Sequence, residues 1–240
     1  MANLTSLPRV KIQLLALERT LRNIRLALEH DMMSLDNPTV PQPKTVQVNS
    51  PMSTFLSTHN SFSPVRISPF EHFFPGICCG YNPTGDGPPL TISGVSYSHP
   101  IPNELDVTTT CLLLNVDLGV TTSADYLTIE TDLDLSDLRR TKDLTLCFSC
   151  LFRASNEVIL SPFRVAMRLK VGPEFKTYYT KSYPSMHYPF DFVYKLDAVQ
   201  YKDLPLADAT VAKILIHLPV DKHLAYSLSW SHFDVSGNSR

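Results

Sequence analysis

The chain has 240 residues, which is enough for one large domain or for one ordinary domain with a helical appendage. Hydrophobic residues make up 43% of it and support a packed core, whereas its 21 basic and 23 acidic residues lack the overall positive field that a non-specific nucleic-acid binder needs. Its 8 glycines and 19 prolines invert the usual ratio of these residues, which argues against an enzyme built on glycine-rich phosphate loops.

The first residues do not combine a basic stretch with a following apolar run, so we expect no signal peptide. No stretch approaches about 18 apolar residues, so we expect no membrane-spanning helix. Five cysteines are an odd set, and without an export signal they predict free thiols in the reducing cytoplasm. Cys147 and Cys150 lie in a predicted strand, where their spacing places them on opposite faces and disfavours a shared metal.

Residues 1–36 predict an amphipathic, coiled-coil helix. Apolar residues recur there at alternating intervals of three and four, as in positions a and d of a heptad seam. The seam is the candidate oligomerisation site and consists of Leu7, Val10, Leu14, Leu17, Leu21, Ile24 and Leu28. Leucine fills position a and β-branched residues enter position d, a distribution that disfavours a parallel dimer and favours a homotrimer. Ser6 can cap the helix, and Pro38 follows its end.

A second apolar line on the same predicted helix consists of Ile12, Leu15 and Leu26. It adds apolar surface outside the seam, and such surface also suits a helix that packs on its own β-domain. Self-association and docking on the β-domain therefore both stay open, and so does the choice between dimer and trimer.

Residues 37–75 predict an extended connector. They hold seven of the 19 prolines together with many Ser, Thr and Asn residues, a composition that opposes a long helix. Residues 45–48 could form one edge strand. The aromatic cluster of Phe70, Phe73 and Phe74 predicts that the far end of the connector packs against the body of its own or a neighbouring subunit.

Residues 76–240 predict an antiparallel β-domain. In residues 126–135, apolar side chains alternate with Thr128, Glu130 and Asp132, as expected for a strand with one core face and one solvent face. The candidate strands are 90–97, 108–118, 126–135, 144–152, 157–171, 175–183, 190–199, 210–218 and 225–235. Their density predicts a mainly β fold, an antiparallel β-sandwich or jelly roll. The segment that ends at 218 could instead be a helix.

Sequence motifs of catalysis and metal binding are missing. The chain has no GxSxG elbow, Walker loop, GxGxxG loop or HExxH pair, so we expect no enzyme activity, no cofactor and no metal. Asp132, Asp134 and Asp137 lack the glycine and the distal glutamate of a calcium loop, and we expect them on a solvated sheet face.

The richest candidate ligand-binding surface is residues 178–194, in which five tyrosines accompany a lysine, a histidine and two prolines. Tyrosine offers contact area and a hydrogen-bonding group at little entropic cost. The candidate residues are Tyr178, Tyr179, Tyr183, His187 and Tyr188. The same tyrosines could instead line a sandwich edge or a subunit contact.

A heptad helix, a proline-rich connector and a β-domain, in this order, resemble the general plan of trimeric viral attachment or capsid-associated proteins. The resemblance implies a non-enzymatic homo-oligomer, located in the virion or the cytoplasm, whose β-domain binds a receptor or a neighbouring protein. The missing basic arm argues against a coat protein that packages nucleic acid. Two other classes stay open: a cytoplasmic scaffold subunit whose helix pairs with another protein, and a carbohydrate-binding module that uses the tyrosine segment.

Overall fold

The computed structural model describes residues 44–58, 61–83, 90–100, 108–118, 124–154, 157–158, 163–184, 191–218 and 225–240. The heptad seam from Leu7 to Leu28 lies outside these residues, so the N-terminal helix stays a prediction.

The described part of the chain is mainly β, and its strands pair antiparallel, as predicted. Its strands are β1 (Thr45–Gln47), β2 (Phe62–Ile67), β3 (His72–Phe74), β4 (Ile77–Pro83), β5 (Leu90–Pro100), β6 (Thr108–Asp117), β7 (Ala124–Asp132), β8 (Leu144–Ala154), β9 (Glu157–Val158), β10 (Arg164–Val171), β11 (Glu174–Tyr179), β12 (Lys181–Pro184), β13 (Asp191–Leu196), β14 (Ala209–Leu218) and β15 (Ala225–Asn238). Its helices are short: α2 (Pro51–Thr58), α3 (Leu135–Arg139) and α4 (Ala198–Lys202).

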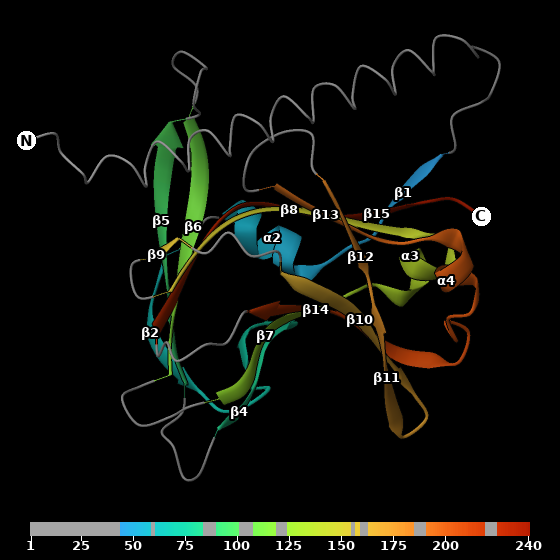
Figure 1. Ribbon diagram of the computed structural model, residues 1–240, viewed down its shortest axis with the longest axis horizontal. Helices are drawn as coiled ribbons and strands as arrows, with labels where there is room; N and C mark the ends of the chain where they lie inside the picture. The colour runs from blue at the N-terminus through green and yellow to red at the C-terminus, as the bar shows by residue number, and fades with distance from the viewer. Residues whose placement is uncertain are drawn as a thin grey trace, which may run out of the picture.

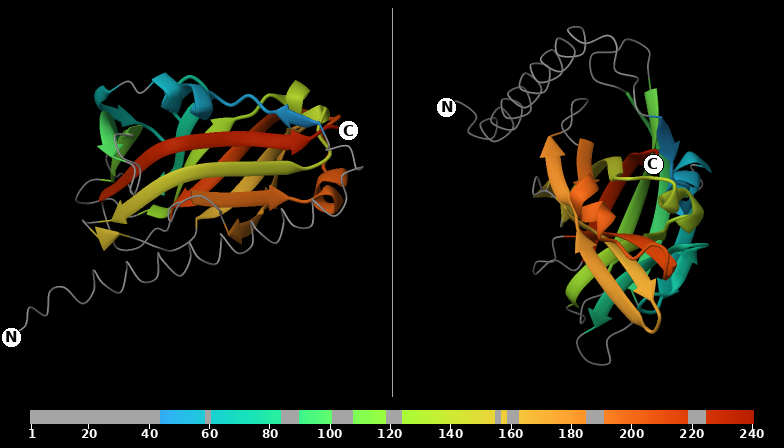
Figure 2. Two further views of the ribbon diagram at one scale, coloured as in Figure 1. Left: turned by 90° about the horizontal axis from the view of Figure 1, so that it is seen from above. Right: turned by 90° about the vertical axis from the view of Figure 1, so that its right-hand side faces the viewer.

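The described strands form two sheets that face each other across one hydrophobic core (Figure 1). The nine-stranded sheet has the order β12-β13-β8-β15-β6-β5-β2, with β1 beside β15 and β9 beside β8. The six-stranded sheet has the order β11-β10-β14-β7-β4-β3. Figure 2 shows the long strands β8 and β15 side by side in the nine-stranded sheet.

Eight strands of the two sheets pair in a nested manner. The first of them, β6, pairs with the last, β15; β7 pairs with β14, β8 with β13, and β10 with β11. Successive pairs lie in alternate sheets, since β6–β15 and β8–β13 belong to the nine-stranded sheet and β7–β14 and β10–β11 to the six-stranded one. These eight strands thus form one long antiparallel hairpin that is rolled into two layers. Pairing of β15 with β8 and of β14 with β10 joins successive turns of the roll.

Seven of the nine candidate strands are each confirmed by one strand at that position, because period-two alternation is a strong signal where one face is buried. The candidates 157–171 and 175–183 are each two strands instead of one, β9 with β10 and β11 with β12, and the two members of each pair belong to different sheets. The segment that ends at 218 is the strand β14 and not a helix. Within residues 157–171, β10 begins at Arg164. The strand β4 was not predicted, because its side chains are buried on both faces and do not alternate in polarity.

Residues 44–75, which composition assigns to a connector, are built into the sandwich. The strand β1 forms at the predicted edge position, while β2 joins the nine-stranded sheet and β3 the six-stranded one. The helix α2 lies between β1 and β2 in the chain. It buries Met52, Phe55 and Leu56 and contacts β15 and β7, one strand of each sheet. The prolines suit their places: Pro51 begins α2, and Pro64 lies in β2 at the edge of its sheet.

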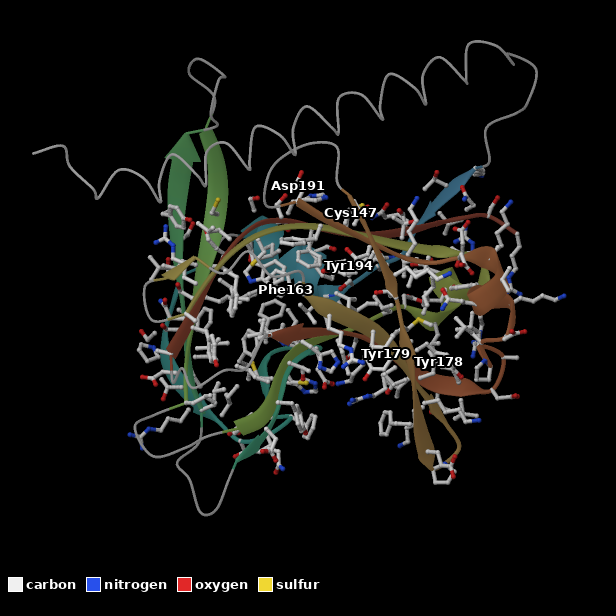
Figure 3. The ribbon with its side chains drawn as sticks, viewed as in Figure 1. Cys147, Phe163, Tyr178, Tyr179, Asp191 and Tyr194 are labelled. Atoms are coloured by element: carbon white, nitrogen blue, oxygen red, sulfur yellow. The ribbon has the colours of Figure 1, made fainter. Side chains whose placement is uncertain are left out.

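An aromatic cluster fills the core around Phe148 of β8. Its ring centroid lies 5.3 Å from that of Phe192, 5.7 Å from that of Tyr194 and 5.3 Å from that of Trp230. From the other side, Phe163 approaches Phe148 to 5.6 Å directly before β10. The Tyr194 hydroxyl donates a hydrogen bond of 2.6 Å to the Phe163 carbonyl oxygen, so that one polar contact joins the two sheets inside the core (Figure 3).

We expect Phe148→Ala to lower the free energy of unfolding by about 3–5 kcal/mol, because the substitution removes the central ring of this cluster and leaves a cavity. Equilibrium unfolding in urea measures the change. The matched control is Phe175→Ala in β11, where the ring is 55% exposed and the expected loss is below about 1 kcal/mol. Equal losses in both variants would contradict the central role of Phe148.

Candidate functional site

The outer face of the six-stranded sheet gathers charged side chains from three adjacent strands. In the pairing register, Arg168 of β10 lies opposite Lys213 of β14, which lies opposite Asp132 of β7. One row further on this face, Glu130 of β7 lies opposite Leu215, and in the row after that Arg164 of β10 lies opposite His217. We call this surface the charged face and define it by Glu130, Asp132, Arg164, Arg168, Lys213 and His217.

Glu130 is the centre of the charged face. Its Oε1 accepts hydrogen bonds from Arg168 Nη1 at 3.4 Å and from Thr128 Oγ1 at 3.2 Å. Lys213 Nζ lies 3.9 Å from Glu130 Oε2 and 3.5 Å from Asp132 Oδ1. A carboxylate removed from water needs such partners, since an isolated buried charge costs several kcal/mol.

The prediction that the polar side of β7 faces solvent is wrong for Thr128 and Glu130. Thr128 is 1% exposed and Glu130 is 2% exposed, although alternation alone places both in water. Long side chains from the neighbouring strands cause the burial: Arg168 and Lys213 extend over Glu130 from one side, and Phe70 covers the other. Periodicity shows on which face a residue lies but not what the adjacent strands place beside it.

Phe70 covers the charged face because of two backbone features. Its φ of 64° is in the left-handed region, which is unfavourable for a residue with a side chain, and its N–H donates to the Cys79 carbonyl oxygen at 2.9 Å. At Gly80, an added Cβ would lie 2.7 Å from Glu130 Oε1 and 2.8 Å from Phe70 Cε1. The glycine therefore provides the space in which the aromatic ring and the buried carboxylate meet.

At the other end of the charged face, Arg164 and Tyr179 form an exposed pair. Arg164 Cζ lies 4.3 Å from the centroid of the Tyr179 ring, and the ring is 45% exposed. His217 lies beside them, with its ring 6.1 Å from that of Tyr179. Burial, and then the positive charges of Arg164 and Arg168, lower the pKa of His217, so this side chain is neutral at pH 7.

The tyrosine segment is only partly on this surface. Tyr178 and Tyr179 are neighbours in β11 and point to opposite faces: Tyr178 is half-buried and packs against the core, whereas Tyr179 joins the charged face (Figure 3). Tyr183 lies in β12 and pairs through its backbone with Val193. His187 and Tyr188 lie outside the described residues. Of the two candidate side chains that the structure describes, Tyr179 is exposed in this cluster and Tyr178 is not.

The cations of the charged face were not found from the sequence. Arg164, Arg168 and Lys213 sit in two strands more than forty positions apart, and only the pairing of β10 with β14 brings them together. The sequence offered one signal: within a predicted strand, residues two or four positions apart lie on the same face. This alternation gives the face of a residue but not its neighbour across the sheet.

The cysteines and aspartates have structural surroundings. Cys150 is buried in the core and Cys147 is half-buried on the other face of β8, so the predicted separation of the pair is confirmed. Burial raises the pKa of the Cys78 thiol to about 11. Asp134 caps α3 by accepting from the Ser136 N–H at 2.7 Å, and Asp137 accepts from Asn49 Nδ2 at 2.8 Å. The described residues contain no group of three or more His, Cys, Asp or Glu that could hold a metal ion.

In the part of the chain that the structure describes, no helix is both long enough and apolar enough to span a membrane. No protein-family model matches the chain, and a search of curated proteins finds no match.

We expect Glu130→Gln to lower the free energy of unfolding by about 3 kcal/mol, since it leaves Arg168 and part of the charge of Lys213 without their buried partner. Thermal and urea unfolding at low salt measure the loss. The matched control is Glu174→Gln in β11, an exposed carboxylate on the same sheet, with an expected change below about 0.5 kcal/mol. A stable Glu130→Gln variant would show that the ion pairs do not hold this face together.

Proposed function

We propose that the chain is a non-enzymatic structural or binding protein of the viral capsid-associated or attachment type. In this proposal its β-domain is a jelly roll that binds a partner, and its N-terminal helix joins the copies. The observation that carries the proposal is the nested pairing of the eight strands from β6 to β15 across two sheets. Two interlocked sheets of this kind are the plan of the jelly roll, which viral capsid and lectin domains use.

A fold by itself does not determine a function, so the partner must be argued from a surface. The charged face supports binding to an acidic group, because the three cations Arg164, Arg168 and Lys213 outnumber its two carboxylates. Arginine donates hydrogen bonds in a planar fork that fits carboxylates, and aromatic residues and arginine are enriched in binding interfaces. The exposed rings of Tyr179 and Phe70 flank the cations. A neighbouring protein or an acidic glycan fits this chemistry.

The heptad seam supports self-association. Seven apolar residues in three uninterrupted repeats form a continuous stripe, and burying such a stripe against other copies removes it from water. Three repeats are short for an isolated coiled coil, so contacts between β-domains add to the assembly in this proposal.

Self-association predicts that the intact chain sediments as a trimer, with a mass of about three times 26.9 kDa. The double variant Leu14→Asp/Leu21→Asp places charges in the seam and should sediment as a single chain. The double variant Gln13→Asp/Thr20→Asp adds the same charges beside the seam and should keep the mass of the intact chain. Single-chain mass for the intact protein at micromolar concentration would reject the self-association.

Partner binding is tested on an array of neutral and acidic oligosaccharides. We expect binding to acidic members, and we expect Arg164→Ala and Tyr179→Ala each to weaken it about tenfold, the loss typical of a residue at the centre of an interface. Lys202→Ala in α4 removes an exposed cation elsewhere and should leave the signal unchanged. A signal that neither charged-face variant alters would reject this surface as the glycan site.

A further inference from the structure

The outer face of the nine-stranded sheet carries an apolar row at its centre. Across four adjacent strands, Val95 lies opposite Leu113, Leu113 opposite Ser229, and Ser229 opposite Leu151. The first of these, Val95, is 49% exposed, and Leu113 and Leu151 are half-buried, although none of the three points into the core. We call Val95, Leu113, Ser229 and Leu151 the apolar row. Such a row in the middle of an outward sheet face indicates a surface that another element covers.

Aspartates flank the apolar row on the same face. Asp234 lies opposite Cys147, and Asp191 lies opposite Ser149, whose hydroxyl hydrogen-bonds to it. Figure 3 shows Asp191 and Cys147 together over β13 and β8 on the outer side of this sheet. Lys195 of β13 is the cation beside them, so two carboxylates accompany one positive charge around Cys147. The other charged residues of this face lie away from Cys147: Asp117, Arg66, Arg153 and Lys181. The surface around Cys147 therefore favours a basic, apolar occupant.

The preceding part of the chain joins this sheet at the end of β15. The Lys44 carbonyl oxygen accepts a hydrogen bond from the Ser239 N–H at 2.8 Å, and Thr45 of β1 pairs with Asn238 at the end of β15. Forty-three residues thus join the fold at one end of the central strands of the nine-stranded sheet. A helix over residues 7–28 would be about 33 Å long, close to the length of about 36 Å of the eleven-residue strand β8. The seven residues 37–43 can span about 23 Å, enough to return the helix along the sheet.

The second apolar line of the predicted helix matches this surface in position and charge. At about 100° per residue, Ile12, Leu15 and Leu26 fall on the side of the helix opposite to the heptad seam. Arg19 and Arg22 fall within the same side. Residues 7–28 contain five basic residues and one acidic residue, so their charge is opposite to that of the flanking aspartates.

We propose that the N-terminal helix packs its second apolar line on the apolar row of its own chain, with Arg19 and Arg22 toward Asp191 and Asp234. The heptad seam then faces away from the sandwich and is free to meet other copies. Self-association and docking on the β-domain use opposite sides of one helix and do not compete. The proposed packing is argued from the sheet surface and the second apolar line, so it does not depend on whether the seam self-associates.

The reactivity of the Cys147 thiol can show whether the helix covers this face. It is half-buried beside Asp234 and Val193, while the other four cysteines are buried. A thiol under a docked helix reacts only when the helix lifts, so its alkylation rate measures the open fraction of the face. The experiment treats the intact chain with N-ethylmaleimide at one fixed pH and follows the Cys147 peptide by mass spectrometry.

In Leu15→Asp/Leu26→Asp, we expect Cys147 to react about tenfold faster than in the intact chain, which corresponds to a docking free energy of about 1.4 kcal/mol. The sedimentation mass should stay that of the intact chain. The matched control is the seam variant Leu14→Asp/Leu21→Asp, which carries the same number of charges in the same helix. We expect it to leave the Cys147 rate unchanged. Cys78, Cys79 and Cys150 are buried away from this face and should stay unreactive in both variants, which verifies that the β-domain is folded.

An unchanged Cys147 rate in Leu15→Asp/Leu26→Asp overturns the proposal. Equal acceleration in the seam variant also overturns it, because the cover would then come from a second copy and be lost with the oligomer. A seam variant that keeps the mass of the intact chain speaks against self-association alone and leaves the docking result intact, so the two proposals fail separately.

Discussion

The packing of aromatic rings around Phe148 is the constraint on which the other features depend. Phe148 lies in β8, between β13 and β15, so its neighbours fix the centre of the nine-stranded sheet. The hydrogen bond from Tyr194 to Phe163 then sets where β10 begins in the opposite sheet. The start of β10 determines which residue of β14 each of its residues meets, and through β14 which residue of β7. Arg168 and Glu130 come together because this register is held from the core.

The buried carboxylate of the charged face contributes more to geometry than to stability. Attraction between Glu130 and its two cations is largely offset by the loss of their hydration, so the pairs add little net free energy. The hydrogen bond from Arg168 and the ion pair with Lys213 nevertheless hold both side chains beside Glu130. Arg164, stacked on Tyr179, is fixed by a ring and not by a carboxylate. The face therefore presents positioned cations whose charge is not fully cancelled.

Much of the fold could be predicted from local patterns, and the surfaces could not. Alternation in β8 correctly placed Cys147 and Cys150 on opposite faces of the strand. Alternation in β7 placed Glu130 on the correct face but in the wrong environment, since the residues that bury it belong to other strands. The helix α2 was not predicted, because the prolines around it argued against a helix, although the first position of a helix accepts a proline such as Pro51. Tyr178 and Tyr179 are adjacent in sequence, and the pleat separates them.

The two outward faces of the sandwich differ for a reason that follows from chain topology. In a nested roll, the first and last strands, β6 and β15, lie side by side in one sheet, so the segment that precedes the roll can enter beside them. That sheet is the nine-stranded one, and the centre of its outer face carries the apolar residues Leu113 and Leu151 between charged residues. The first and last described strands, β1 and β15, both belong to the nine-stranded sheet, and the outer face of the six-stranded sheet carries the cations and the exposed Tyr179. An apolar row on the sheet that the chain enters and a cluster of cations on the other sheet suit a protein that holds its own N-terminal segment on one side and a partner on the other.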